Sequence, residues 1–326
     1  MNEPTDDPAI VPAATTPDAG LSRRSLLLGA TGVATAAALG SSSPAIALDS
    51  IDETARASAT ATRVEVPVPT GGYDPTVRYV ALYGFPGSRT LGVLGEFSVQ
   101  GAVDRARAVA DTYAGLGRPV VPMFEIIASV AAADAGGDGD YSNEFSADRF
   151  RPHIDAAIDN GIQVLFDLQT GRSTFDQQAR EYEDLWRFPN THMALDPEWR
   201  FNAPGRPGGG RIGTVDAPEV NRTIEYLDDV IERRGLPPKM LVIHQFVPAM
   251  VTNKSQIRQT DNVRVVMHMD GFGPLANKRN SYERMVRDLP PGAVTGWKNF
   301  YDEDRPTPTP AQTVNDEPSP ILISYQ

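Results

Sequence analysis

Eight short apolar runs, rich in β-branched residues, limit what this chain can fold into more than any other feature. Runs of four to eight such residues are typical of strands buried on both faces of a parallel sheet. They are Arg78–Gly84, Pro119–Ile126, Ile162–Leu168, Thr191–Leu195, Lys239–Phe246, Val263–Met269, Ala293–Trp297 and Ile321–Tyr325.

Segments with helical spacing of apolar residues separate several of these runs. Several of these segments begin at a capping Ser or Asp or end at a Gly, residues that commonly start and stop helices. The expected helices are 103–113, the segment from Ser146 to Gly161, Phe175–Trp186, and the segment from Asp216 to Gly235.

Alternation of strands and helices with eight strands predicts an α/β fold, a (β/α)₈ TIM-type barrel, over residues 76–326. The barrel should be irregular at its fifth and seventh helices. Ala249–Asn262 is barely long enough for a helix with its loops, and Asp302–Pro320 contains five prolines. The alternative is an open doubly wound sheet.

The first 47 residues are typical of a targeting signal. Arg23 and Arg24 directly precede a leucine run, and Ala45 and Ala47 form a small-x-small cleavage pattern. The apolar stretch is shorter than the roughly 20 residues that a membrane span needs. We therefore expect export of the folded protein by the twin-arginine pathway and a secreted, extracellular or cell-wall-associated product without a membrane anchor. Residues 48–75 are expected to form a linker or N-terminal extension.

The composition limits the classes of molecule that the protein is expected to bind. The chain has no cysteine, which excludes disulfides and thiolate chemistry, and its formal net charge is −12. An acidic surface argues against binding nucleic acid or an anionic membrane, since both need basic patches. A neutral or cationic substrate fits this charge, while the oligomeric state stays open. No motif for a cofactor is present, so none is expected.

Polar residues follow one expected strand after another. In a (β/α)₈ barrel the carboxyl ends of the strands form the mouth, where catalytic residues lie. Buried acids at this density are costly unless they serve a function. The residues concerned are Glu125, Asp167, Gln169, Asp196, Glu198, His244, Gln245, His268, Asp270, Lys298 and Asn299.

The strongest local pattern is Asp196-Pro197-Glu198-Trp199. In a strand, residues two apart share a face, so both carboxylates can point into the mouth. Two close carboxylates push their pKa values apart, and one stays protonated near neutral pH. Glu198 is the expected general acid, oriented by Asp196. Aromatic residues near the strand ends are expected to stack on a sugar ring: Tyr83, Phe85, Trp199, Phe272, Trp297 and Tyr301.

A second pattern is His268-x-Asp270, followed by Gly-Phe-Gly. Asp270 is the first choice for a nucleophile or water-activating base, and Asp167 is the second. The remaining polar strand ends would bind substrate. A divalent metal held by His244, His268 and Asp270 is an alternative, although no known metal-binding spacing is present. Histidines that only form hydrogen bonds in the barrel wall are the simpler expectation.

The segment Ala194–Trp199 resembles the end of strand four in barrels of the glycoside-hydrolase type. Many of those place an acid/base glutamate there, with a second carboxylate on strand six or seven. The chain departs from that pattern, because strand seven offers Lys298 and Asn299, so the partner must be Asp270, Asp196 or Asp167. The chain from about Tyr79 to Asp304, including Val266–Gly273, also resembles a group of uncharacterised secreted actinobacterial proteins.

These observations predict a secreted glycosidase that acts on a polysaccharide, with the cell envelope as one source. Two alternatives stay open from the sequence. The first is a metal-dependent hydrolase that uses His244, His268 and Asp270. The second is a barrel that binds glycans without catalysis.

Overall fold

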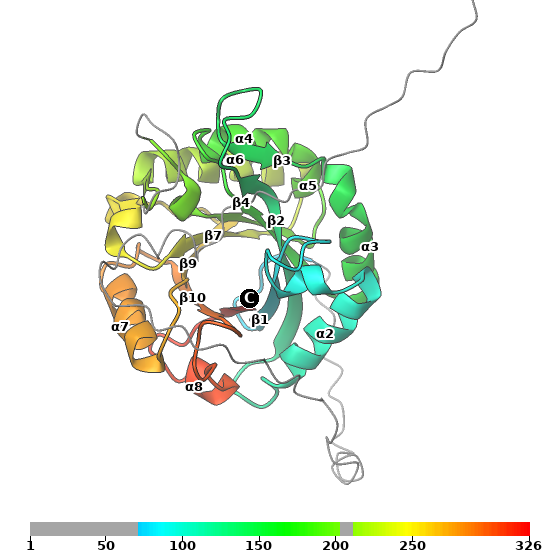
Figure 1. The fold of residues 1–326 in the computed structure, drawn as a ribbon, viewed down its shortest axis with the longest axis vertical. Helices are drawn as coiled ribbons and strands as arrows, with labels where there is room; N and C mark the ends of the chain where they lie inside the picture. The colour runs from blue at the N-terminus through cyan, green and yellow to red at the C-terminus, as the bar shows by residue number, and fades with distance from the viewer. Residues whose placement is uncertain (1–70, 203–210) are drawn as a thin grey trace, which may run out of the picture.

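The computed structural model describes residues 71–202 and 211–326, and it is a closed barrel of eight parallel strands with helices outside (Figure 1). Each strand lies at an expected run, and three have the expected bounds. The strands are β1 (Arg78–Gly84), β2 (Val120–Ala131), β4 (Gln163–Leu168), β5 (Thr191–Leu195), β7 (Lys239–Gln245), β9 (Val263–Met269), β10 (Val294–Asn299) and β11 (Leu322–Tyr325).

Pairing of β1 with both β2 and β11 closes the ring. Tyr79 pairs with Val121 on one side and with Leu322 on the other. Around the barrel the order is β1, β11, β10, β9, β7, β5, β4 and β2. The open doubly wound sheet is therefore wrong and the (β/α)₈ barrel is confirmed.

The helices surround the barrel as Figure 1 shows. They are α2 (Val99–Asp111), α3 (Arg151–Asn160), α4 (Phe175–Glu181), α5 (Glu183–Trp186), α6 (Ala217–Arg234), α7 (Leu275–Val286) and α8 (Pro310–Val314). Short 3₁₀ turns are η2 (Val93–Glu96), η3 (Ala147–Phe150), η4 (Pro197–Trp199), η5 (Pro248–Met250) and η6 (Lys254–Gln256). Three minor strands are β3 (Ser142–Glu144), antiparallel to β2, and the pair β6 (Val215–Asp216) and β8 (Val251–Thr252).

Local capping explains where several helices begin and end. The Asp216 side chain accepts a hydrogen bond from the backbone N–H of Glu219 at the start of α6, and Gly235 ends that helix in the left-handed region. Gly161 ends α3 in the same way. The expected helix Phe175–Trp186 is divided at Tyr182, whose backbone leaves the helical region.

The two expected irregularities are present. Between β7 and β9 the described chain forms only η5, β8 and η6, because the connection is too short for a packed helix. Between β10 and β11 the prolines leave room for the five residues of α8, which Pro310 begins.

Two apolar layers support the barrel. Between the strands and the helices lies the larger cluster, which includes Trp186 and Trp297. Inside the barrel, at the amino ends of the strands, a smaller cluster forms an apolar floor. Its members are Val77, Tyr79, Ala81, Val121, Met123, Leu165, Ala194, Met240, Val242, Val266, Ile321 and Leu322.

The expected signal segment, residues 1–47, lies outside the described residues, as does 48–70 of the expected linker. Within the described parts of the chain, no helix has the length and apolar character needed to cross a membrane.

Candidate active site

Each strand of the barrel has, on it or directly after it, a buried polar side chain on the same face as its floor residues, two or four positions closer to the mouth. Side chains alternate between the two faces of a strand, so a residue two or four positions beyond a floor residue also points inward. The ring consists of Tyr83, Glu125, Asp167, Asp196, His244, His268, Lys298 and Ser324, all at most 4% exposed.

His244 lies at the centre of this ring between two carboxylates. Its Nε2 is 2.9 Å from Oε1 of Glu125, and its Nδ1 is 3.0 Å from Oδ2 of Asp270. Burial opposes the charged imidazolium, but the charges and hydrogen bonds of Asp270 and Glu125 raise the pKa of His244 well above 6.5. The ring is therefore a cation that contacts an anion on each side.

Glu125 is the fully buried partner of that cation. Burial alone would raise the pKa of its carboxyl, but the hydrogen bond and charge of His244, together with the charge of Lys298, lower the pKa to about 2. Glu125 is thus a fixed anion beneath the mouth.

Asp270 follows the end of β9 and also contacts Lys298. The Lys298 Nζ is 3.5 Å from Oδ1 of Asp270 and 3.2 Å from the centre of the Tyr83 ring. The ammonium is thus held by a carboxylate and by an aromatic face. With His244 on the other oxygen, Asp270 has a cation beside each carboxylate oxygen.

At Asp167, unlike at Glu125, the effect of burial on the carboxyl outweighs that of the nearby cations. Tyr83 donates a hydrogen bond to its Oδ2 at 2.9 Å, and Gln169 Nε2 lies 3.4 Å from the Tyr83 hydroxyl. Burial raises the pKa of Asp167 to about 7, helped by the charges of Asp196 and Glu125 and opposed by those of His244 and Lys298. Near neutral pH the protonated and ionised forms of Asp167 are therefore both populated.

His268 is neutral and packs closely. Burial, with the charge of nearby His244, lowers the pKa of His268 to about 3. Its Nε2 lies 3.1 Å from Oγ of Ser324, and its ring centre is 4.9 Å from that of His244. Gly296 on β10 makes room for the ring, because a Cβ at that position would lie 2.4 Å from Cδ2 of His268. His268 therefore acts as a wall of the site.

The acidic pair of the sequence pattern lies on η4, directly after β5. Oδ1 of Asp196 accepts the backbone N–H of Glu198 at 3.2 Å and so begins this turn. The backbone N–H of Gly213 binds the carbonyl of Glu198 at 2.8 Å. Asp196 thus caps the turn from which the Glu198 side chain extends. The expectation that the two carboxylates share one face of a strand is wrong, because β5 ends at Leu195 and Glu198 belongs to a 3₁₀ turn.

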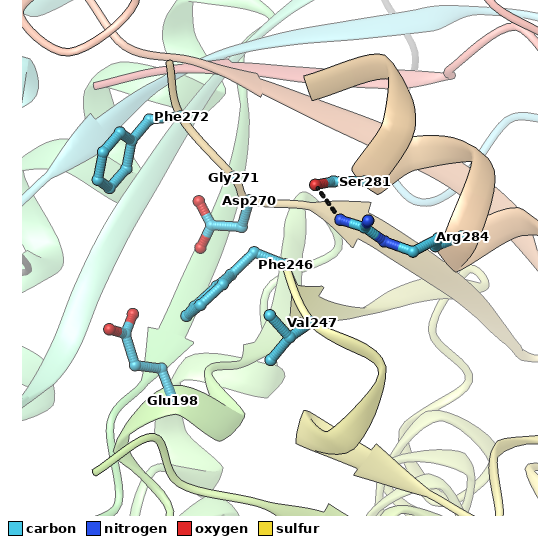
Figure 2. A pocket seen from close by; sticks show the side chains of 8 residues that line it. All are labelled: Glu198, Phe246, Val247, Asp270, Gly271, Phe272, Ser281 and Arg284. Atoms are coloured by element: carbon cyan, nitrogen blue, oxygen red, sulfur yellow. Dashed lines mark hydrogen bonds between the residues drawn. The ribbon is translucent and has the colours of Figure 1, made fainter. Parts of the chain in front are cut away.

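A pocket of about 260 Å³ opens between the loops that follow β5, β7 and β9. Figure 2 shows the carboxylates of Glu198 and Asp270 facing the same open space, with the rings of Phe246 and Phe272 beside them. Arg284 of α7 lines the pocket as well. The pocket thus combines two carboxyl groups, two aromatic rings and one guanidinium.

A buried ion pair holds the loop that carries Phe272. Lys278 contacts Asp304 at 2.5 Å and donates to the carbonyl of Lys298 at 2.7 Å. Asp304 in turn accepts the backbone N–H groups of Gly273 and Phe300 at 2.8 and 2.9 Å. The loop after β9 is therefore tied to the loop after β10, which places Phe272 at the rim, 38% exposed.

Some expected site residues lie elsewhere. Gln245 donates to the carbonyls of Val247 and Pro248, and Asn299 contacts Trp297 and Thr313 in the helix layer. Each follows an inward residue, so it points to the other face of its strand. Trp199 packs on Phe201 and Ala131, and Tyr301 stacks on Tyr325. None of these four lines the pocket described above, and of the other expected site residues only Glu198, Asp270 and the aromatic Phe272 line it. The remaining expected residues are buried outside the pocket lining: Tyr83, Phe85, Glu125, Asp167, Gln169, Asp196, His244, His268, Trp297 and Lys298.

The positions of the possible ligand atoms test the alternative that a metal ion binds at His244, His268 and Asp270. In the described residues, the one group of three potential ligands whose donor atoms lie within 4.8 Å of one another is Asp138, Asp140 and Glu144. Asp138 and Glu144 are exposed and Asp140 is 8% exposed, and they lie in the loop after β2 and on β3. Within the described residues His244, His268 and Asp270 do not form such a group, and Nε2 of His268 lies 3.1 Å from Oγ of Ser324.

Pocket residues such as Phe246 and Arg284 were not assigned to the site from the sequence. Phe246 ends an expected strand without a polar side chain. Arg284 is on α7, where the few apolar residues gave no clear helix pattern.

Comparison with known proteins gives similarity at the level of the fold. No protein-family model matches the chain, and no curated protein matches it in sequence. Solved structures that resemble it include dihydrodipicolinate synthase from Bacillus clausii (12% identity, TM-score 0.32, covering 69% of this chain and 61% of that one). Others are the Clostridial cellulose synthase subunit Z from Clostridioides difficile (8%, 0.38, 76% and 91%) and alanine racemase from Clostridium difficile 630 (8%, 0.34, 78% and 51%). At these values a reaction can be argued only from the site itself.

Proposed function

We propose that this protein is a glycoside hydrolase whose two catalytic carboxyl groups are Glu198 and Asp270. The observation that carries the proposal is their common pocket (Figure 2). Cleavage of a glycosidic bond through an oxocarbenium-like transition state needs one proton donor and one carboxylate on opposite sides of the bond. A pocket lined by two carboxyl groups from different strands meets that need.

The surroundings of Asp270 assign it the charged role. His244 and Lys298 each contact one of its oxygens, at 3.0 and 3.5 Å, and two neighbouring cations favour the carboxylate. Asp270 therefore acts on the sugar carbon as a nucleophile, or on the attacking water as a base. The proton for the leaving oxygen then comes from Glu198, whose backbone Asp196 holds in place.

Aromatic rings complete a sugar-binding surface. Phe272 stands at the rim, packed edge-on against Phe300 with ring centres 5.8 Å apart, and Phe246 lies within the pocket. The apolar face of a pyranose packs on such rings, while its hydroxyl groups bind polar side chains. If residues 1–47 act as the expected export signal, the substrate lies outside the cytoplasm, and an envelope or extracellular polysaccharide fits that location.

The test is turnover of a panel of oligosaccharides by the mature protein and by Glu198→Gln. Loss of proton donation should lower kcat by about 10²–10⁴-fold, with little change in binding. Aryl glycosides whose leaving group needs no proton should be much less affected. Glu283→Gln, an exposed change on α7, serves as the control and should keep full activity.

Three outcomes would contradict the proposal. Near-normal turnover by Glu198→Gln on a natural glycan would remove the acid assignment. Loss of wild-type activity on treatment with a chelator would replace the glycosidase with the metal-dependent hydrolase. Glycan binding without turnover by the wild-type protein would instead support the non-catalytic barrel.

A further inference from the structure

The pocket contains one cation whose role the proposed reaction leaves unexplained. Arg284 lines it from α7, and its Nη2 donates to Oγ of Ser281, one helical turn earlier, at 3.0 Å. Within the described residues, Ser281 is the one partner that its guanidinium has, and the Arg284 side chain is exposed. The remaining guanidinium N–H groups are therefore available to a ligand in the pocket.

Position separates Arg284 from the bond-breaking groups. In the view of Figure 2, Glu198 lies on one side of the Phe246 ring and Arg284 lies on the other, on α7. A cation that served the catalytic carboxylates would contact them directly, as His244 and Lys298 contact Asp270. Within the described part of the chain, Arg284 forms no hydrogen bond or ion pair with either carboxylate, so its guanidinium is free to meet another portion of a bound substrate.

Its hydrogen bond to Ser281 orients the guanidinium. The two residues are three positions apart on one helix, so they are neighbours on its surface. A planar guanidinium with free N–H groups on one edge matches a carboxylate, which it binds through two parallel hydrogen bonds. Aromatic Phe246 and Phe272 fit the sugar ring that would carry such a group.

We infer that the substrate is an acidic glycan and that Arg284 binds the carboxylate of a uronic acid unit beside the bond that is cleaved. This inference rests on the proposed function and names the substrate class for the same pocket. The acidic surface of the protein as a whole does not favour such a ligand, so the recognition is local and short in range.

The experiment uses matched ligands that differ in one group. Oligomers of glucuronate, galacturonate, mannuronate and guluronate are each compared with their carboxyl-reduced forms, in which a neutral alcohol replaces the carboxylate. Binding is measured by calorimetry on Glu198→Gln, and turnover is measured on the wild-type protein. At least one acidic oligomer should bind and react about tenfold better than its reduced form, by the usual strength of a charge-assisted hydrogen bond.

Variants assign the preference to Arg284. Arg284→Met should bring the acidic and reduced oligomers to equal affinity, and Arg284→Lys should restore part of the difference. Arg287→Met removes another exposed arginine, at the end of the same helix and outside the pocket, and should keep the full preference. Added salt should reduce the preference of the wild-type protein.

The outcomes separate the two proposals. Turnover of a glycan without preference for the acidic form, or a preference that survives in Arg284→Met, overturns the uronate inference and leaves the glycosidase. An acidic preference in binding with no turnover by the wild-type protein removes the glycosidase and leaves only the recognition of a uronate carboxylate by Arg284. Neither binding nor turnover of any oligomer overturns both.

Discussion

Nδ1 of His244 lies 3.0 Å from Oδ2 of Asp270, and this contact distinguishes the two carboxyl groups of the pocket. Asp270 faces an imidazolium that Glu125 holds from the opposite side, at 2.9 Å. Because Glu125 is anionic over the whole physiological pH range, the imidazolium keeps its proton while it contacts Asp270. The positive charge of His244 therefore stabilises the carboxylate form of Asp270, and Glu125 in turn stabilises that positive charge.

Removal of the Asp270 charge should abolish turnover regardless of the leaving group. Asp270→Asn eliminates the group that attacks the sugar carbon or activates water, so kcat should fall by about 10³-fold or more. Steady-state kinetics with a natural oligosaccharide and an activated aryl glycoside measure this. A full rate on the aryl glycoside alone would show that Asp270 donates the proton and that the two roles are reversed.

Replacement of His244 should change the pH profile as well as the rate. His244→Gln keeps hydrogen-bonding capacity but removes the cation, so Asp270 should take up a proton at higher pH. The acid limb of kcat/KM should therefore move to higher pH, and kcat should fall by about 10²-fold.

The control for His244→Gln is His153→Gln, on α3 and away from the mouth, which should keep the wild-type profile. Thermal unfolding verifies that both variants fold. If His244→Gln lowers the rate without moving the acid limb, His244 only supports the structure.

Asp167 should make the stability of the protein depend on pH below neutrality. Its pKa of about 7 in the folded state exceeds its ordinary value of 3.8. The stability that this raised pKa contributes is therefore fully present below pH 3.8 and is lost as the pH rises through 7. Asp167→Asn imitates the protonated form and should flatten this dependence between about pH 4 and 7.

Urea unfolding at several pH values measures the free energy of unfolding for wild type and Asp167→Asn. Exposed Asp148→Asn on η3 is the control and should leave the curve unchanged. An unaltered slope in Asp167→Asn would mean that Asp167 is ionised in the folded protein at pH 5.

Export should depend on the arginine pair. Replacement of Arg23 and Arg24 by lysine should leave the full-length precursor inside the cell, since the twin-arginine receptor reads both arginines. Fractionation and immunoblotting of the precursor measure this. Normal secretion of the double variant would exclude the twin-arginine route.

The sequence predicted the barrel well because each strand is buried on both faces. Such strands appear as short continuous apolar runs, and their order along the chain is also their order around the barrel. The site was predicted less completely. Side chains at adjacent positions of a strand cannot both face the mouth, which separates His244 from Gln245 and Lys298 from Asn299.

Other parts of the site depend on contacts that sequence spacing does not encode. Arg284 reaches the pocket because α7 packs beside the loop after β9, and Phe246 is indistinguishable in sequence from a core residue. The charge on His244 follows from Glu125 and Asp270 lying on either side of it, which required the register of three strands.

The pairing of β1 with β11 has a consequence for the order of events during synthesis. Tyr79 cannot meet Leu322 until nearly the whole barrel has left the ribosome, so earlier intermediates are curved sheets with two unpaired edges. Ring closure joins the segments that are farthest apart in sequence and is therefore expected late. If the chain is exported folded, as the arginine pair predicts, pairing of β11 would have to precede translocation, and a chain without β11 would expose both edges to aggregation.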